Sequence, residues 1–179
     1  LMGDAADTVT GTGGADTIFG GGGNDKLIAG DSAFGNGDVY DGGAGTGDTI
    51  SYEDFDWGTP ATVVRLNLKT DTAFFNGFTE ALLNIENVIG SNGDEVINGG
   101  VGEANTLWGL DGDDILRGKG GDDELYGGGG DDVLLTGTGA DLILGGTGAD
   151  VAKGKGAADT MLGGGGDDRF FGNDGADLL

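Results

Sequence analysis

The feature that most constrains the fold of this chain is an aspartate that returns every nine residues throughout residues 109–179. Each aspartate closes a glycine-rich turn and is followed two residues later by an apolar residue. Residues 127–135 show the unit, which follows the pattern G-G-x-G-x-D-x-U-x with U apolar. A strict period of this length is typical of a solenoid, in which each repeat packs only against its neighbours.

The same period opens the chain and then slips. Asp7, Asp16 and Asp25 stand nine residues apart, and each has an apolar residue two positions later. About four extra residues precede Asp38, and one more precedes Asp48. Extra residues in a solenoid normally leave the repeat as loops on one side, so the first 51 residues are predicted to form a repeat block with bulges.

Residues 52–80 carry no repeat. Val64, Leu66 and Leu68 alternate with polar residues, which predicts a half-buried strand. The pair Asn76-Gly77 predicts a turn between two aromatic segments. We expect a short strand-bearing insertion that packs against the solenoid, with a small core of its own made of Phe55, Trp57, Phe74, Phe75 and Phe78.

The register resumes after the insertion with altered residues in the aspartate position. Glu86 and Glu95 stand in that position, and only Asn105 is available in the next repeat, where one extra residue appears. The predicted division is therefore a first repeat block (1–51), a β insertion (52–80), degenerate repeats (81–108) and a regular roll (109–179). Fewer or looser ions are expected in the degenerate repeats, which should also be the joint between the two parts.

The expected fold is all-β, a right-handed parallel β-roll. Each nonapeptide should form a tight turn and a very short strand whose apolar residue points inward. Two nonapeptides should complete one coil, so that residues eighteen apart stack on the same side. Asp114 and Asp132 would then line one edge, and Asp123 and Asp141 the other. Stacked coils lie about 4.8 Å apart, which lets two carboxylates from successive coils reach one ion.

Composition favours a divalent cation as the ligand. The 179 residues include 32 acidic and 8 basic ones, with a formal charge of −24 and 44 glycines. Such a charge argues against nucleic acid and anionic membrane surfaces as partners, and carboxylates are hard ligands suited to Ca²⁺. No apolar run is long enough for a transmembrane helix.

No catalytic residue is predicted, because the chain has neither histidine nor cysteine. The predicted Ca²⁺ ligands are the repeat aspartates and the carbonyls of turn glycines. The aspartates are Asp7, Asp16, Asp25, Asp114, Asp123, Asp132, Asp141, Asp150, Asp159, Asp168 and Asp177. The glycines are Gly118, Gly120, Gly127, Gly128, Gly130, Gly145, Gly146, Gly148, Gly163, Gly164 and Gly166.

The repeat unit resembles the nonapeptide of the RTX (repeats-in-toxin, hemolysin-type calcium-binding) family. Residues 48–52, DTISY, and residues 84–91, NIENVIGS, are similar to elements that often flank an alternating strand in RTX sequences. The resemblance implies an extracellular or cell-surface bacterial module. Such proteins are exported unfolded by type I secretion and fold when they meet external calcium.

The parent protein stays open at this stage. One hypothesis is a structural scaffold such as a surface-layer protein or adhesin, with self-association or packing against the rest of a longer chain. A second is the C-terminal repeat region of a secreted protease, lipase or alginate epimerase. A third is a pore-forming toxin. In the last two, the active part would lie outside these residues.

Overall fold

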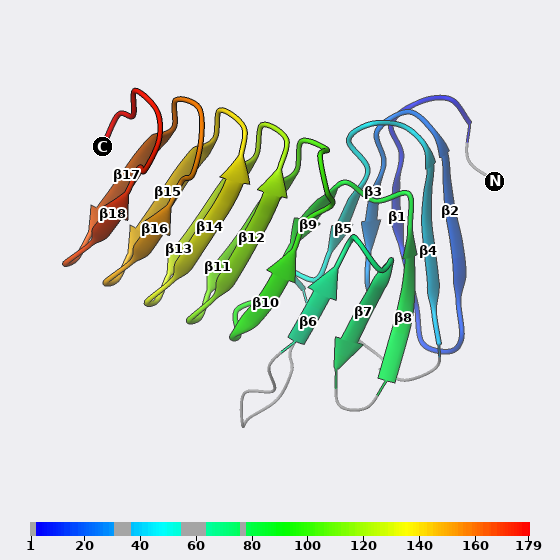
Figure 1. The fold of residues 1–179 in the computed structure, drawn as a ribbon. Helices are drawn as coiled ribbons and strands as arrows, with labels where there is room; N and C mark the ends of the chain where they lie inside the picture. Colours follow the sequence, from blue (N-terminus) through cyan, green and yellow to red (C-terminus); the bar gives the residue numbers. More distant parts are fainter. Residues whose placement is uncertain (1–2, 31–36, 55–63, 76–77) are drawn as a thin grey trace.

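The computed structural model describes the chain except residues 1–2, 31–36, 55–63 and 76–77, and every regular element in this described part is a strand. The strands form two sheets that run along one solenoid, with the N-terminal strands at one end and the C-terminal strands at the other (Figure 1). The predicted all-β parallel solenoid is therefore confirmed. Within the described residues, no helix is long and apolar enough to span a bilayer.

Sheet A has eight strands in the order β1-β3-β5-β9-β11-β13-β15-β17. Every neighbouring pair in it is parallel. The strands are β1 (Thr8–Thr10), β3 (Lys26–Ile28), β5 (Thr49–Ser51), β9 (Asn87–Ile89), β11 (Thr106–Asp111), β13 (Glu124–Gly129), β15 (Leu142–Thr147) and β17 (Thr160–Gly165).

Sheet B has ten strands in the order β18-β16-β14-β12-β10-β6-β7-β8-β4-β2. The strands are β2 (Thr17–Gly22), β4 (Val39–Ala44), β6 (Val64–Asn67), β7 (Thr72–Phe75), β8 (Phe78–Leu83), β10 (Glu95–Asn98), β12 (Ile115–Gly120), β14 (Val133–Thr138), β16 (Val151–Lys153) and β18 (Arg169–Phe171). Consecutive strands of the regular block alternate between the sheets, so two nonapeptides make one coil as predicted.

The register is set by the apolar residue of each repeat. In the regular block Leu116 pairs with Leu134, eighteen residues away. Where the repeats carry extra residues, Ile18 still pairs with Tyr40, and Leu27 with Ile50. A slip of one residue would turn every side chain to the opposite face. The insertions are therefore accommodated outside the strands, and the inward set is preserved.

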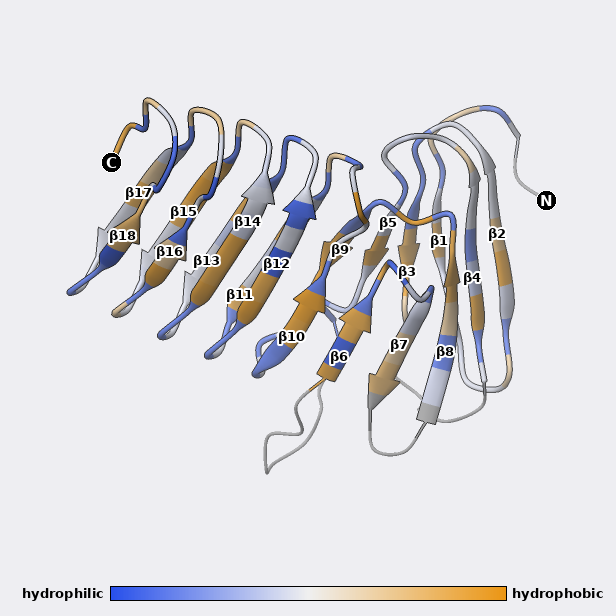
Figure 2. Ribbon diagram, viewed as in Figure 1, coloured by the Kyte–Doolittle hydropathy of each residue, from blue (hydrophilic) through white to orange (hydrophobic). Residues whose placement is uncertain are grey.

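The core is a single layer of these inward side chains between the two sheets, visible as hydrophobic bands along the strands in Figure 2. Each of its central members is at most 2% exposed. Sheet A contributes Leu27, Ile50, Val88, Leu107, Leu125, Ile143 and Met161. Sheet B contributes Tyr40, Leu82, Leu66, Ile97, Leu116, Leu134 and Ala152. This core is thin relative to the number of residues that it must hold in place.

The strands of the regular block are longer than predicted. Each of β12 to β15 has six residues and includes the first glycines of the next repeat. Gly128 pairs with Gly146, for example, within the β13–β15 ladder. The very short strand expected after each turn is therefore wrong here, because glycine without a side chain continues the ladder at close approach.

The insertion does not pack against the roll; it is part of sheet B. β6 pairs in parallel with β10, β8 pairs in parallel with β4, and β7 joins them in antiparallel fashion. The predicted alternation is confirmed, since Val64 and Leu66 are fully buried and Arg65 is exposed. Phe75 pairs with Phe78 across the hairpin, and the predicted turn at residues 76–77 lies outside the described residues.

The expected aromatic core of the insertion is wrong at Phe74, which is 41% exposed. Phe55 and Trp57 lie outside the described residues, and nothing is described of the Phe75 and Phe78 side chains. Sheet A has no added strand at the level of the insertion, because β5 pairs directly with β9. Sheet B has two strands more than sheet A, and the two halves of the roll diverge at this level (Figure 1).

Candidate metal site

The repeat aspartates form two columns, one on each edge of the roll. Most column residues immediately precede a strand, so the turn before them and the ladder after them fix their position. The exceptions are Glu95, which is the first residue of β10, and Asp177, which precedes an isolated β-bridge at Leu178. The sheet A column contains Asp7, Asp25, Asp48, Glu86, Asn105, Asp123, Asp141, Asp159 and Asp177. The sheet B column contains Asp16, Asp38, Glu95, Asp114, Asp132, Asp150 and Asp168. The predicted stacking of aspartates eighteen residues apart is borne out by these positions.

One oxygen of each stacked carboxylate is used inside the protein. The Asp114 backbone N–H donates to Asp132 Oδ1 at 2.8 Å, and the Asp132 N–H donates to Asp150 Oδ1 at 2.9 Å. The other column repeats this, with the Asp123 N–H donating to Asp141 Oδ1 at 2.8 Å. Each of these carboxylates therefore links its own coil to the preceding coil by accepting a backbone N–H from it.

The second oxygen of the same carboxylates is buried without a hydrogen-bond partner among the described residues. A buried carboxylate oxygen with no partner carries the full cost of losing water. Eight aspartates share this state: six are consecutive column residues of the regular roll, three on each edge, and two lie in the first repeat block. They are Asp25, Asp48, Asp114, Asp123, Asp132, Asp141, Asp150 and Asp159. A column of such oxygens is an unsatisfied acceptor set that a cation would complete.

Burial also shifts the acidity of these groups. Loss of water raises the pKa of Asp114 to about 8, that of Asp132 to about 7 and that of Asp123 to about 6. The backbone N–H bond opposes the shift in each case, and neighbouring carboxylates add to it. Without a cation, burial thus shifts these sites toward the protonated acid, whereas a divalent ion would favour the carboxylate.

The glycine five residues before each aspartate makes room for the free oxygen. A Cβ placed on Gly109, Gly118 or Gly127 would collide with the Oδ2 atom of the aspartate five positions later. Glycine is therefore required here for space beside the carboxylate. This position is held by four of the predicted ligands, Gly118, Gly127, Gly145 and Gly163. Backbone atoms therefore line the space beside the free carboxylate oxygen.

Calcium takes six to eight oxygen ligands, and carboxylates alone do not supply them. In the described part of the chain, no three acidic side chains gather around one point. Backbone carbonyls must provide the remainder, and some predicted carbonyls already have partners, such as that of Gly120, which accepts the Gly102 N–H. The residues fit calcium by chemistry and by their free oxygens, and the individual glycine ligands stay a prediction.

The column ends differ from the middle of the regular roll. Asp7, Asp16, Asp168 and Asp177 are only half-buried. The second oxygen of Asp16 accepts the Thr12 N–H at 2.9 Å. All four were predicted as ligands, and their greater access to water gives them less need of an ion.

Asp38 and Asp48 belong to the columns but were not among the predicted ligands. The Asp16 N–H donates to Asp38 Oδ1 at 2.7 Å, and the Asp25 N–H donates to Asp48 Oδ1 at 2.7 Å. They were missed because the repeats that contain them are longer than nine residues. The signal that identifies them is the buried residue two positions later, Tyr40 for the first and Ile50 for the second.

Thr136 is a further position that the sequence pattern did not single out. It stands five residues before Asp141, where the neighbouring repeats have glycine. Its hydroxyl oxygen is buried and has no hydrogen-bond partner among the described residues. It is an additional candidate oxygen ligand beside Asp141, and the break in the glycine pattern is its only signal.

The degenerate repeats satisfy their column residues with protein donors. Both oxygens of Glu95 accept hydrogen bonds from Ser91, one from the hydroxyl and one from the backbone N–H. Asn105 accepts the Gly100 N–H at 2.8 Å and donates its side-chain N–H to the Glu86 carbonyl at 2.7 Å. Glu86 in turn accepts the Asp48 N–H at 2.9 Å. Neither Glu86 nor Glu95 has a partnerless buried oxygen.

The comparison with known families agrees with this geometry. A family model described as the RTX calcium-binding nonapeptide repeat (4 copies) matches residues 3–33, 89–122, 108–143 and 144–179, which together cover more than half of the chain. No curated protein matches the chain. The chain belongs to the RTX calcium-binding nonapeptide-repeat family and forms a β-roll module of that non-catalytic kind.

Proposed function

We propose that this chain is a calcium-dependent folding module that serves as a rigid scaffold in a secreted or cell-surface bacterial protein. The observation that carries the proposal is the set of buried carboxylate oxygens without partners along both edges of the roll. Each of them needs a positive partner, and the chain has only 8 basic residues against 32 acidic ones. Several calcium ions in the columns meet this need.

The same buried oxygens would couple folding to calcium binding. Ordering a residue costs about 1–2 kcal/mol of backbone entropy, and a fully buried large side chain returns about 1.5–3 kcal/mol. The roll buries only one such side chain per nonapeptide in its core. Ion binding must supply much of the remaining stabilisation, so the free energy of calcium binding is folding free energy.

The coupling suits a protein that is exported before it folds. Extracellular calcium modules bind with dissociation constants of roughly 10⁻⁴–10⁻³ M. A chain of this charge stays expanded by self-repulsion where calcium is scarce, and collapses onto the ions outside the cell. Export by type I secretion, as in RTX proteins generally, is part of this proposal.

The parent protein is proposed to use the roll as a scaffold, as in a surface-layer protein or adhesin. The alternative is a secreted protease, lipase, alginate epimerase or pore-forming toxin that carries the roll as its repeat region. The chain has no histidine or cysteine, so a Ser-His-Asp triad or a Cys-His pair would lie elsewhere in such a parent. The full-length sequence distinguishes these cases.

The test of the module's own function is circular dichroism of the chain with excess chelator and during a calcium titration. We expect little β-structure in chelator, a cooperative gain at about 10⁻⁴–10⁻³ M calcium, and a weaker response to Mg²⁺, which demands a tighter octahedral shell. A chain with equal β content in chelator and in calcium would contradict the proposal.

A further inference from the structure

The side chain of Lys119 holds a repeat position that glycine fills in the next coil. Lys119 pairs with Gly137 in the β12–β14 ladder, and their φ angles are +84° and +129°. Such left-handed backbone favours glycine over residues with a side chain. A Cβ on Gly137 would also collide with the Lys119 carbonyl in the coil before it. A lysine kept at this position therefore needs a compensating contact.

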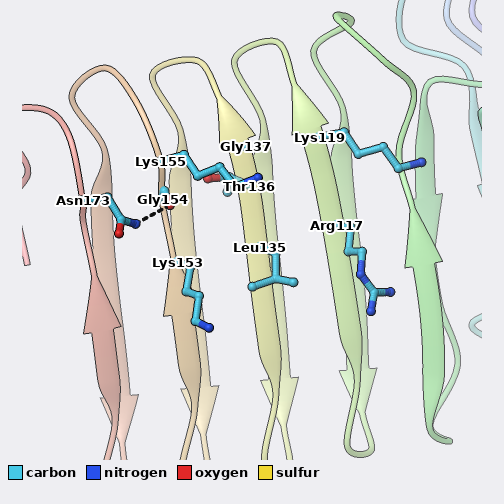
Figure 3. A pocket seen from close by; sticks show the side chains of 9 residues that line it. All are labelled: Arg117, Lys119, Leu135, Thr136, Gly137, Lys153, Gly154, Lys155 and Asn173. Carbon is cyan, nitrogen blue, oxygen red and sulfur yellow. Dashed lines mark hydrogen bonds between the residues drawn. The ribbon is translucent and has the colours of Figure 1, made fainter.

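The coil before Lys119 leaves room for its side chain. Strand β12 extends beyond its register with β10, which ends where Arg117 pairs with Asn98. The loop that follows β10 carries the extra residue of the degenerate repeat. On the other edge of the Lys119 coil, Leu110 also keeps a side chain at a φ of +84°. The Lys119 side chain extends away from Gly137, toward the preceding coil (Figure 3).

The Lys119 ammonium reaches a backbone carbonyl of that preceding coil. It donates to the Gly99 carbonyl at 2.9 Å, in a partly buried hydrogen bond. Gly99 is the counterpart of the glycines beside the regular aspartates. A Cβ on it would collide with Asn105 Oδ1, just as a Cβ on Gly118 would collide with Asp123 Oδ2. Carbonyls of such glycines, Gly118 among them, are predicted calcium ligands in the regular roll. The corresponding carbonyl here accepts an ammonium instead.

Positive charge is concentrated at the edge of the roll where the column loses its carboxylate. Asn105 replaces the aspartate with a neutral amide, whose oxygen already accepts the Gly100 N–H at 2.8 Å. Burial lowers the pKa of Lys119, and the charges of Lys69 and Arg117 lower it further. These three cations would repel a divalent ion at this level, and the column residue offers it no carboxylate.

We propose that Lys119 takes the place of a calcium ion at the level of Asn105, as a cation that the chain itself carries. The inference rests on the proposed function, because it requires calcium at the equivalent positions of the regular roll. The ammonium satisfies the Gly99 carbonyl at every calcium concentration, whereas an ion would do so only when bound. The first coil of the regular roll is thereby joined to the degenerate repeats without calcium. The calcium-dependent coils then have a formed edge on which to stack.

The test follows the hydrogen-exchange protection of residues 99–108 while calcium is raised. The background variant is Asn105→Asp, which supplies the missing carboxylate. Lys119→Met is then added, because it removes the ammonium and keeps an unbranched side chain at the same backbone angle. A positive charge beside a divalent ion weakens its binding. We therefore expect the calcium midpoint for these amides to fall by about tenfold when Lys119→Met is combined with Asn105→Asp.

Lys155 provides the matched control for loss of charge. It holds the same repeat position as Lys119 two coils further on. Its side chain is exposed and makes no hydrogen bond or ion pair among the described residues. Lys155→Met should leave the calcium midpoint of Asn105→Asp unchanged. In the chain with Asn105 intact, Lys119→Met should lower the protection of residues 99–108 equally at low and high calcium, and Lys119→Arg should restore it.

The proposal is overturned if Asn105→Asp has the same calcium midpoint with and without Lys119→Met, or if Lys155→Met lowers that midpoint as much. It is also overturned if calcium restores the protection that Lys119→Met alone removes, since an ion would then bind beside Asn105 itself. If Lys119→Met does not fold, Lys119→Gly replaces it, because glycine favours a φ of +84°. The calcium proposal fails separately, if residues 109–179 are equally protected in chelator and in calcium. A calcium-dependent roll with an unchanged midpoint refutes only the role of Lys119.

Discussion

The regular roll and the degenerate repeats differ in how the polar residues at the edges of their coils are satisfied. Both place a polar residue at each edge of the roll, at or directly before the start of a strand. From Asp114 to Asp159 that residue is aspartate, with one oxygen accepting a backbone N–H of the preceding coil and the other buried without a hydrogen-bond partner among the described residues. In the degenerate repeats Glu95 and Asn105 have their side-chain atoms bonded to Ser91, Gly100 and Glu86.

The contrast shows that the repeat geometry does not itself require an ion. A longer carboxylate or an amide can close the edge with hydrogen bonds from its own loop. Five aspartates of the regular roll do not, because their second oxygen faces the space left open by the glycine five residues earlier. They are Asp114, Asp123, Asp132, Asp150 and Asp159. Asp16 differs, since its second oxygen accepts the Thr12 N–H. We therefore expect the regular roll to depend on calcium more than the middle of the chain does.

The largest effect is expected from Asp132→Ala. The change leaves the buried Asp114 N–H without its acceptor and removes one free oxygen from the column. An unsatisfied buried group costs about 1–3 kcal/mol, and the lost ligand adds to it. Calorimetric titration should show fewer ions and a higher calcium midpoint. Asp167→Ala, which removes the same charge at an exposed position, is the control; equal behaviour of the two variants would show that the column aspartates are not ligands.

Asn105→Asp should convert a degenerate position into a regular one. The variant loses the side-chain N–H that donates to the Glu86 carbonyl and gains a carboxylate in the column. Without calcium it should be less stable than the parent by about 1–3 kcal/mol, and calcium should recover the loss. Titration should reveal about one additional ion, as expected for a completed carboxylate site. An unchanged ion count would mean that the loop geometry, rather than the residue, decides binding.

Ser91→Ala tests the hydrogen-bonded alternative. It removes the hydroxyl that donates to Glu95, a carboxylate that is 1% exposed and whose pKa burial raises to about 7. We expect a loss of about 1–2 kcal/mol in unfolding free energy, equal at low and high calcium. Ser51→Ala is the control, because the buried Ser51 hydroxyl has no hydrogen-bond partner among the described residues. A Ser91→Ala effect that calcium reverses would place an ion at this edge.

A smaller effect is expected from pH in the presence of chelator. The folded pKa values of Asp114, Asp132 and Asp123, at about 8, 7 and 6, lie above the ordinary value near 3.9. The folded state then binds more protons than the unfolded state, so stability falls as pH rises from about 5 to 8. Chelated protein should gain β content on mild acidification, and Asp114→Asn should lose part of this response. A gain of β content with rising pH would contradict the burial of free carboxylates.

Much of the fold followed from the period alone, because one residue type recurred at a fixed distance from an inward side chain. Leu116 and Leu134 are inward, and Asp114 and Asp132 stack, as the eighteen-residue coil requires. The alternation at Val64 and Leu66 predicted a strand, but its place inside sheet B depends on long-range pairing with β10. The local sequence pattern carries no information about which distant strand pairs with this one.

The site was predictable to the extent that spacing was regular. Asp38 and Asp48 were missed because extra residues displaced them, although the strands on either side keep the register. That Glu95 is satisfied by Ser91 depends on a loop conformation that spacing does not specify.

The measurement that tests the central claim most directly is hydrogen exchange followed at stepwise lower calcium. The claim is that calcium stabilises the regular roll through its aspartate columns, whereas the degenerate repeats are held by protein hydrogen bonds. Amides of residues 109–179 should lose protection steeply as calcium falls, and amides of residues 64–75 and 78–98 should retain more of theirs. A single cooperative loss of protection in both regions at one calcium concentration would contradict the claim.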